Sequence, residues 1–479
     1  MIQRDAADDK SDVSKGGSRM HISPTIFREY DIRGIADVDL TDQVVSAIGQ
    51  AFGTWLVRQG VRKIVVGGDV RVSTRRISGA LVEGLLRTGV DVLNIGTVTT
   101  PVLYWSLHHF EVGGGVMITG SHNPKDMNGL KLAFRGATLY GDDIQEILRM
   151  VLEDDMADAA HPGSLNEADI RDEYVRMLLS KCSLGPKKLK VVCDSGNGTA
   201  GMMIGRYLET LGCEVVSLFD TPDGTFPNHH PDPQQRENLV SLMDAVRREK
   251  ADVGLAFDGD ADRLGVVDER GEMIWGDILM ALFWREILPK HPGADVIVEV
   301  KCSQSLIDDA LKFGGKPLFW KSGHSVIKAK MKEIKAVFAG ELSGHFFFAD
   351  EYFGFDDSFY AAARLLRILS SSDKTLSEMI SDIPRYPSTA EVRINCPDEK
   401  KFDVVASLRD KALEEYEAIT VDGVRILYPE GWGLIRASNT QPVIVTRCEG
   451  RTEADLETIS ADVRRRLLAE GLPDFSWTY

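Results

Sequence analysis

The chain has 479 residues, of which 43% are apolar and 27% charged, with a formal net charge of −17 at pH 7. This length exceeds what one hydrophobic core accommodates, so three or four domains are expected. The acidic balance argues against nonspecific nucleic-acid binding, and no apolar run approaches the roughly 20 residues of a membrane span. An acidic protein that binds anions must therefore gather its Arg and Lys residues locally.

The first twenty residues are polar and mixed in charge. They lack the apolar segment of a signal peptide and predict a disordered tail. The six cysteines are scattered without a C-x-x-C pair, which favours reduced thiols over a zinc site or a disulfide framework. These features predict a cytoplasmic protein.

Three segments repeat one pattern: a buried apolar strand, a polar residue at its end, and a helix stopped by glycine. The first strands of the three repeats are expected at 63–69, 189–194 and 295–301. Each repeat closes with a second apolar strand that leads into a loop of small and polar residues, at 116–121, 253–258 and 337–341. The pattern is typical of parallel α/β units, in which ligands gather at the carboxyl ends of strands. We therefore expect the three loops to surround one cleft.

The region after residue 388 has a different pattern, with short strands and two long helices. The strands are expected at 392–396, 424–428, 433–436 and 443–447, with helices near 398–417 and 453–469. This predicts a small α+β domain with an antiparallel sheet. The predicted layout is a tail at 1–20 and domains at 21–168, 169–272, 273–385 and 386–479.

The first loop with a chemical signal is Thr119-Gly-Ser-His-Asn-Pro124, followed by Asn128-Gly-Leu-Lys131. Gly120 permits a tight turn that would expose the Ser121 hydroxyl at a strand end. Taken alone, such a turn is more often a structural cap than a nucleophile, and His122 is either a base or a turn residue.

The second loop is Asp258-Gly-Asp-Ala-Asp-Arg263, directly after a predicted strand. Three carboxylates at alternate positions must be solvated or bound to a cation, and oxygen ligands favour Mg²⁺ or Ca²⁺. An EF-hand is excluded because Arg263 stands where its invariant glycine belongs and the flanks are strand-like. A solvated acidic turn is the plain alternative to a metal site.

The third loop, Gly340-Glu-Leu-Ser-Gly-His345, alternates Glu341, Ser343 and His345. In an extended loop these side chains would face the same way, and a carboxylate with a hydroxyl suits vicinal sugar hydroxyls. His345 is as consistent with a structural role as with a reactive one.

The fourth loop is Arg436-Ala-Ser-Asn-Thr440, with Arg447 seven residues beyond it. Two guanidinium groups and several hydroxyl and amide donors suit a phosphate dianion. An ordinary polar turn is the alternative. The residues that could form the required positive patch are Arg33, Lys131, Lys301, Arg436 and Arg447.

Together the four loops resemble the α-D-phosphohexomutase family, specifically its phosphomannomutase/phosphoglucomutase branch. The resemblance runs from Phe27-Arg-Glu-Tyr-Asp-Ile-Arg-Gly34 nearly to the C-terminus and includes the motifs at 223–232, 321–325 and 352–357. It implies three related mixed-sheet α/β domains and a smaller C-terminal α+β domain around a central cleft.

The resemblance also implies an activity. The enzyme would interconvert the 1-phosphate and 6-phosphate of mannose or glucose, through a phosphoserine and a 1,6-bisphosphosugar, with one Mg²⁺ per chain. Glucose 1,6-bisphosphate is a candidate activator. The implied partners are phosphorylated hexoses, without nucleic acid or membrane, for a monomer or weak homo-oligomer. Phosphoglucosamine mutase is the alternative, disfavoured by the Ser-Asn-Thr turn and Leu342; a sugar phosphatase and a non-catalytic phosphosugar-binding protein are further rivals.

By the same resemblance, Ser121 is the phosphoserine and binds the metal together with Asp258, Asp260 and Asp262. The implied proton-transfer and phosphoryl-clamping residues are Arg33, His122, Lys131, Arg263 and His345. The implied substrate contacts are Tyr30, Lys301, His324, Glu341, Ser343, Arg436, Ser438, Asn439, Thr440 and Arg447. Glu341 and Ser343 would hold O3 and O4, which are alike in glucose and mannose, so both sugars would be accepted.

Overall fold

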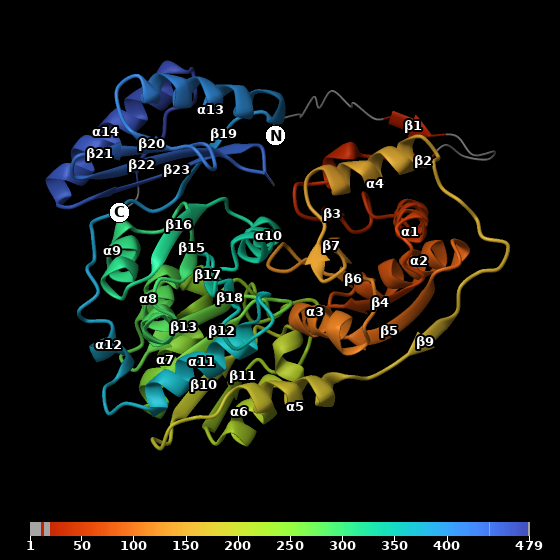
Figure 1. Ribbon diagram of the computed structural model, residues 1–479, viewed down its shortest axis with the longest axis horizontal. Coiled ribbons are helices and arrows are strands. Elements are labelled where there is room, and N and C mark those ends of the chain that lie inside the picture. The colour runs from red at the N-terminus through yellow and green to blue at the C-terminus, as the bar shows by residue number, and fades with distance from the viewer. Residues whose placement is uncertain (1–10, 14–19, 440, 478–479) are drawn as a thin grey trace. The chain divides into compact units, whose positions relative to one another are not determined.

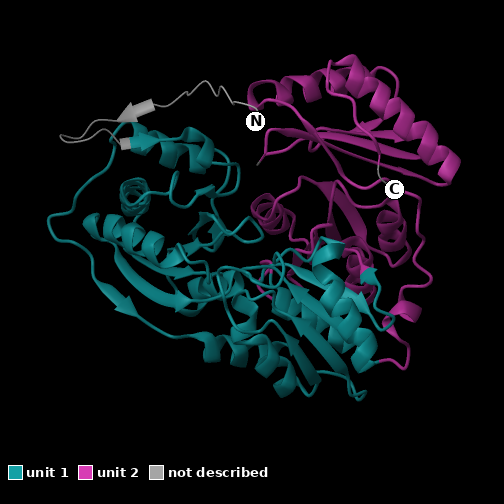
Figure 2. Ribbon diagram, turned by 180° about the vertical axis from the view of Figure 1, so that it is seen from behind, with its two compact units in different colours: residues 1–273, 357–371 teal, residues 274–356, 372–479 magenta. Residues whose placement is uncertain are grey.

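The computed structural model describes residues 11–13, 20–439 and 441–477. The chain forms two compact units, coloured separately in Figure 2: unit 1 runs through residue 273 and adds 357–371, and unit 2 comprises 274–356 and 372–479. Most of the predicted tail, 1–10 and 14–19, lies outside the described residues. Strand β1 (Ser11–Val13) pairs with β2 (Met20–Ile22). Within the described ranges, no helix has the length and apolar character needed to cross a membrane.

Unit 1 begins with a mixed sheet and the helices that pack on it (Figure 1). Its strands are β3 Ile32–Ile35, β4 Lys63–Gly68, β5 Asp91–Thr97, β6 Gly114–Ile118, β7 Met127–Phe134, β8 Ala137–Thr138 and β9 Leu165–Glu167. Its helices are α1 Asp42–Arg58, α2 Thr74–Arg87, α3 Thr100–His109 and α4 Asp142–Leu152. Strand β4 is parallel to β5 and β6, whereas β7 is antiparallel to β6 and β3. Strands β4 and β6 are almost entirely buried, which explains their continuous apolar sequence.

The second sheet of unit 1 repeats this arrangement. Its strands are β10 Lys190–Asp194, β11 Glu214–Leu218, β12 Val253–Phe257, β13 Leu264–Asp268 and β14 Met273–Ile274, and its helices are α5 Arg171–Lys181, α6 Ile204–Leu211 and α7 Val240–Glu249. Strand β10 is parallel to β11 and β12, and β13 returns antiparallel to β12.

Unit 2 contains a third sheet of the same design. Its strands are β15 Asp295–Glu299, β16 Lys316–Trp320, β17 Phe338–Gly340 and β18 Phe346–Phe348, with helices α8 Gly276–Ile287, α9 Gln304–Lys312, α10 His324–Ile334 and α12 Leu376–Met379. The strand orders β5-β4-β6-β7, β11-β10-β12-β13 and β16-β15-β17-β18 are equivalent. The predicted threefold repeat is confirmed, and each chemical loop joins the last two strands of its repeat.

The fourth sheet is antiparallel, as the sequence predicts. Its strands, in the order β19-β23-β22-β21-β20, are β19 Val392–Asn395, β20 Ala418–Ile419, β21 Val424–Tyr428, β22 Gly431–Ala437 and β23 Val443–Gly450. Helices α13 (Asp398–Leu413) and α14 (Glu453–Ala469) cover one face, where apolar side chains of both helices and the strands form one core (Figure 1). The domain limits near 168, 272 and 385 stay predictions, as does the single cleft.

Helix α11 (Ser358–Ser370) returns to unit 1 although it follows the third sheet in sequence. Its Phe359 is fully buried, and the Phe359 ring lies within 6.3 Å of the rings of Tyr174, Tyr207 and Phe257 (centroid to centroid). This aromatic cluster packs α11 and the helices α5 and α6 against β12, the strand that leads into the Asp258 loop.

We expect Phe359→Ala to lower the free energy of unfolding by about 3–5 kcal/mol, because it removes a ring from a packed aromatic cluster. Hydrogen exchange of the α5 and α6 amides, together with urea denaturation, measures the loss within unit 1. The matched variant Phe402→Ala changes a side chain that is 55% exposed. Its free energy of unfolding is expected to stay within about 0.5 kcal/mol of that of the unmodified protein. Equal losses in the two variants would contradict this account of α11.

Candidate functional site

The loop between β6 and β7 places Ser121 in a strained, buried turn. Ser121 has φ of +48°, in the left-handed region that L-residues avoid, and its side chain is nearly inaccessible. Its Oγ donates a hydrogen bond of 2.7 Å to Oδ2 of Asp258, 137 residues further along the chain. Nδ1 of His122 lies 3.2 Å from the same oxygen. A hydroxyl, a carboxylate and an imidazole thus meet at one point of unit 1.

The loop between β12 and β13 brings three carboxylates together. Asp258, Asp260 and Asp262 are fully buried, and one oxygen from each lies within 4.8 Å of the others. The turn is tight because Oδ1 of Asp258 accepts hydrogen bonds from the backbone N–H groups of Asp262 and Arg263. A Cβ added at Gly259 would lie 2.6 Å from the carbonyl oxygen of Ser121, so a glycine is needed for the two loops to approach.

The electrostatics of this loop suit a divalent cation. Burial raises the pKa of Asp258 well above its usual value, and the charges of Asp262 and Asp260 raise it further. Lys131 of β7 donates to Asp260 at 3.0 Å and to Asp262 at 2.5 Å; although burial opposes the effect, this ammonium holds the pKa of Asp260 below its usual range. Oδ1 of Asp260 is buried and has no hydrogen-bond partner among the described residues. The three carboxylates therefore fit a hard metal ion.

Two further predicted residues lie on the strands beside Lys131. Arg33 of β3 stands opposite Gly129 of β7, two residues from Lys131, so both cationic side chains emerge on the same face of the sheet. Nε of Arg33 pairs with Asp31 at 2.6 Å. Tyr30 is buried just before β3.

The loop between β17 and β18 positions the predicted sugar-binding residues of unit 2. Glu341 is buried, and its Oε1 accepts a hydrogen bond of 2.8 Å from the Gly323 N–H. Burial and the nearby Glu299 raise the pKa of Glu341. Ser343 follows in the same turn, which closes with a 3.0 Å hydrogen bond from the Glu341 N–H to the His345 carbonyl.

His345 belongs to a charged cluster within unit 2. Its Nδ1 lies 3.1 Å from Oδ2 of Asp356, and its ring stacks on that of His324 with centroids 5.8 Å apart. Lys328 pairs with the same Asp356 at 2.9 Å. Lys328 and the two imidazoles overcome the effect of burial and hold the pKa of Asp356 well below its usual range. A carboxylate bound to the imidazole fixes the orientation of the His345 ring.

The predicted phosphate-binding cations of unit 2 are linked to one another. Nη1 of Arg447 donates to the Lys301 carbonyl at 2.8 Å, and Nζ of Lys301 pairs with Glu299 at 3.1 Å and Glu391 at 3.3 Å. The Lys301 ammonium lowers the pKa of Glu391 to about 2. Arg436 is buried on β22 and contributes positive charge to the same region.

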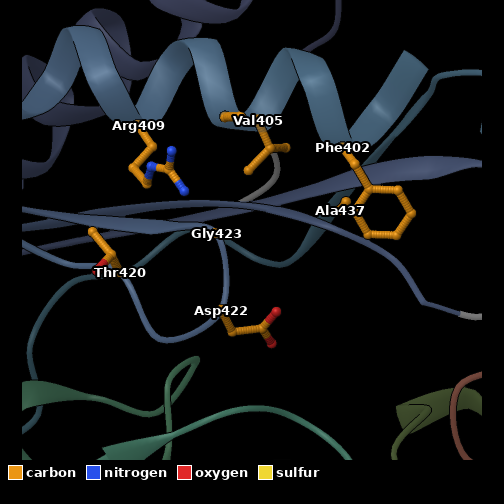
Figure 3. A pocket seen from close by; sticks show the side chains of 8 residues that line it. Phe402, Val405, Arg409, Thr420, Asp422, Gly423 and Ala437 are labelled. Atoms are coloured by element: carbon orange, nitrogen blue, oxygen red, sulfur yellow. The ribbon is translucent and has the colours of Figure 1, made fainter. Parts of the chain in front are cut away.

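Asp422 holds Arg436 in place, with 2.8 Å between its Oδ2 and Nε of the arginine. Asp422 also lines a cavity of about 170 Å³ between α13 and the sheet, together with Phe402 and Arg409 (Figure 3). Ser438 is buried and its hydroxyl accepts from the Gln441 N–H; Asn439 follows it, and Thr440 lies outside the described residues.

Several polar residues that contact these loops, within one unit or the other, were not singled out from the sequence. Thr100 donates to Asp260 at 2.5 Å, and Arg71 binds the Ser121 loop. Glu299 accepts hydrogen bonds from Ser322 and from the Leu342 N–H, so it ties two loops of unit 2 together. A signal existed for Glu299, because it is a charged residue inside the apolar strand expected at 295–301, and the structure ends β15 at this residue.

Comparisons with known proteins match most of the chain to one family. Residues 24–158, 172–271 and 275–386 match the models for alpha/beta/alpha domains I, II and III of phosphoglucomutase/phosphomannomutase, and 391–466 match its C-terminal domain.

Individual relatives cover nearly the full length. The chain is 44% identical over 446 residues to a phosphomannomutase/phosphoglucomutase of Pseudomonas aeruginosa, covering 93% of this chain and 96% of that protein. It is 43% identical over 459 residues to a phosphoglucomutase of Neisseria gonorrhoeae, covering 95% and 99%. A crystal structure of a phosphoglucomutase/phosphomannomutase family protein from Burkholderia thailandensis has 40% identity and a TM-score of 0.88, covering 96% of this chain and 100% of that one.

The predicted family and fold are therefore confirmed. The chain belongs to the phosphoglucomutase/phosphomannomutase family, and it is a mutase that interconverts hexose 1-phosphates and hexose 6-phosphates through a phosphoserine and a 1,6-bisphosphosugar intermediate.

Proposed function

We propose that Ser121 carries the transferred phosphoryl group and that Asp258, Asp260 and Asp262 hold one Mg²⁺ beside it. The observation that carries the proposal is the 2.7 Å hydrogen bond between Ser121 Oγ and Asp258, which joins the two loops inside one compact unit. When bound, the ion would partly offset the negative charge of the transferring phosphoryl group. The chemistry then depends mainly on how precisely the chain holds the reacting oxygens.

The proton transfers are assigned to residues that lie close to the Ser121 hydroxyl or to a buried carboxylate. His122, with Nδ1 3.2 Å from the Ser121 hydroxyl, and Lys131, bound to two of the carboxylates, are the candidates in unit 1. Arg33 and Arg263 supply further positive charge for the phosphoryl oxygens. His345, oriented by Asp356, is the candidate in unit 2.

The substrates are proposed to be glucose and mannose phosphates. Glu341 and Ser343 would bind O3 and O4 of the sugar, with Tyr30 and His324 as further contacts. Lys301, Arg436 and Arg447, with Ser438, Asn439 and Thr440, would bind the phosphate that is not being transferred. Glucose and mannose differ at C2, which none of these residues is assigned to contact, so both are expected to be accepted.

The reaction would proceed by two transfers. Phosphorylated Ser121 gives its phosphoryl group to a hexose 1-phosphate, the bisphosphate turns over, and its other phosphate returns to Ser121. Glucose 1,6-bisphosphate would act as an activator by restoring the phosphoserine of an enzyme that has lost it. A phosphatase would instead release free phosphate without the 6-phosphate product, and a phosphosugar-binding protein would produce neither.

Ser121→Ala is expected to lower the turnover of glucose 1-phosphate and mannose 1-phosphate by about 10³-fold or more, while substrate affinity changes little. ³¹P NMR follows the 1-phosphate, the 6-phosphate, the bisphosphate and free phosphate together, and calorimetry measures affinity. Ser180→Ala, on the exposed face of α5, is the matched control. Undiminished turnover in Ser121→Ala would exclude Ser121 as the carrier.

Asp260→Asn should raise the Mg²⁺ concentration for half-maximal activity by at least about 10-fold, because it removes one negative oxygen ligand. Binding of Mn²⁺, followed by electron paramagnetic resonance without substrate, should weaken in parallel. Asp244→Asn changes an exposed aspartate in the same unit and should alter neither quantity. An unchanged metal requirement in Asp260→Asn would contradict the assigned ligand set.

Glu341→Gln is expected to raise KM for glucose 1-phosphate and mannose 1-phosphate alike, by about 10- to 100-fold, because a charged acceptor for the sugar hydroxyls is lost. The ratio of kcat/KM between the two sugars should stay within about threefold of the unmodified enzyme if Glu341 contacts only hydroxyls common to both. Coupled assays on both sugars give this ratio, and Glu333→Gln on the exposed face of α10 is the control. A large change in the ratio would show that Glu341 senses C2.

A further inference from the structure

The guanidinium of Arg71 binds four backbone carbonyls of the Ser121 loop. Nη2 donates to the carbonyls of Ser121 at 2.8 Å and Asn123 at 2.6 Å, and Nη1 donates to those of Pro124 at 2.6 Å and Met127 at 3.0 Å. Arg71 is only 2% exposed, so these bonds are protected from water. The planar guanidinium thus connects Ser121 to Met127, the first residue of β7.

Asp69 holds the opposite end of the same loop. Its Oδ2 accepts hydrogen bonds from the Thr119 hydroxyl at 2.9 Å and the Gly120 N–H at 3.1 Å, and it lies 3.2 Å from Nε of Arg71. Its Oδ1 accepts from the Arg71 N–H and from Thr74. The two charged side chains form one buried pair that fixes both ends of the loop.

The loop follows the guanidinium closely where Ser121 is strained. A Cβ added at Gly120 would lie 2.4 Å from Nε of Arg71, so the chain passes directly over the guanidinium. The next residue, Ser121, has φ of +48°, a left-handed conformation that is strained for an L-residue. The bond from Arg71 to the Ser121 carbonyl stabilises this turn, and the same turn directs Oγ toward Asp258.

The 223–232 loop, which follows β11 of the second sheet, holds Arg71 from the other side. The ring of Phe226 lies over the guanidinium, 5.2 Å from its carbon to the ring centroid. A Cβ at Gly224 would lie 2.3 Å from the Val70 carbonyl oxygen, so the 223–232 loop approaches the Arg71 backbone. His230 also contacts the His122 carbonyl through Nε2. Arg71 is therefore fixed from two sides, by the Ser121 loop and by the 223–232 loop, which follows β11 of the sheet that carries the carboxylates.

We propose that Arg71 and Asp69 are positioning residues for phosphoryl transfer, which hold the Ser121 loop in the strained turn that aims the hydroxyl at the metal-binding carboxylates. The inference rests on Ser121 as the phosphoryl carrier, as proposed above. Lysine cannot replace Arg71, because an ammonium has neither the planar geometry nor enough donors for four carbonyls and a carboxylate. A displacement of Ser121 by about 1 Å would suffice to slow transfer about 10²-fold without weakening substrate binding.

The test compares Arg71→Lys, Arg71→Ala, Asp69→Asn and Gly120→Ala with a matched arginine control. The control is Arg76→Ala, because Arg76 also binds the carbonyls of a loop, those of Ala36 and Leu40, away from Ser121. Gly120→Ala keeps the charged pair and displaces the loop from it. All are assayed as full-length enzyme for kcat and KM with glucose 1-phosphate, for thermal stability, and for phosphate on the Ser121 peptide by mass spectrometry after incubation with glucose 1,6-bisphosphate.

The expected result for Arg71→Lys and Gly120→Ala is a fall in kcat of about 10- to 100-fold per folded molecule, KM within about twofold, and slower phosphorylation of Ser121. Added guanidinium is expected to restore part of the activity of Arg71→Ala, whereas Arg76→Ala keeps full kcat. If activity instead falls only in proportion to the unfolded fraction, with kcat per folded molecule unchanged in Gly120→Ala as well, the inference is overturned. Phosphate located on a residue other than Ser121 in the unmodified enzyme removes the proposed carrier itself, an outcome separate from unchanged kinetics in the variants.

Discussion

Burying three carboxylates within 4.8 Å of one another is the constraint that organises unit 1. Their mutual repulsion and their loss of water both oppose ionisation, and the raised pKa of Asp258 reflects this. The chain offsets the negative charge with Lys131, with backbone N–H groups and with the hydroxyls of Thr100 and Ser121. What remains is a concentrated negative site suited to a divalent ion, placed directly against the hydroxyl of Ser121, the proposed phosphoryl carrier.

In each repeat, a carboxylate at the end of the first strand binds a neighbouring loop and holds it in place. Asp69 binds the Ser121 loop, and Glu299 binds the N–H of Leu342 in the loop between β17 and β18. In the second repeat, Asp194 accepts from the Gly196 N–H and contacts His229 of the 223–232 loop. The equivalent strand orders explain this, because each strand ends beside the loops of its neighbours. The three repeats thus share a carboxylate that holds their loops, whereas the loops themselves carry different chemical groups.

In unit 2, arginine side chains hold the segment around Lys301 by hydrogen bonds to its backbone carbonyls. Arg425 is fully buried between the rings of Phe319 and Trp432 and donates to the carbonyls of Val300 and Cys302. Burial lowers the pKa of Arg425 to about 9, because a charged guanidinium is unfavourable away from water. The two aromatic rings and the two carbonyls stabilise the charged form. Arg447 donates to the carbonyl of Lys301, which lies between Val300 and Cys302 in the chain. The segment that carries Lys301 is therefore held by two arginines of the antiparallel sheet. In a strongly acidic protein, positive charge is thereby gathered in one place.

The sequence alone determined the repeated α/β pattern, the antiparallel C-terminal sheet and the four chemical loops, because buried strands, helix ends and polar turns depend on local composition. Helix α14 was predicted at its observed bounds, 453–469, whereas α13 ends at Leu413, short of the predicted 417. Only the tertiary structure decided that α11 packs in unit 1, that Gly259 allows the Asp258 loop to reach Ser121, and that Arg71 and Asp69 hold the Ser121 turn. These features join residues far apart in the chain, and a single sequence carries no local pattern that identifies which distant backbone a buried arginine or a glycine will meet.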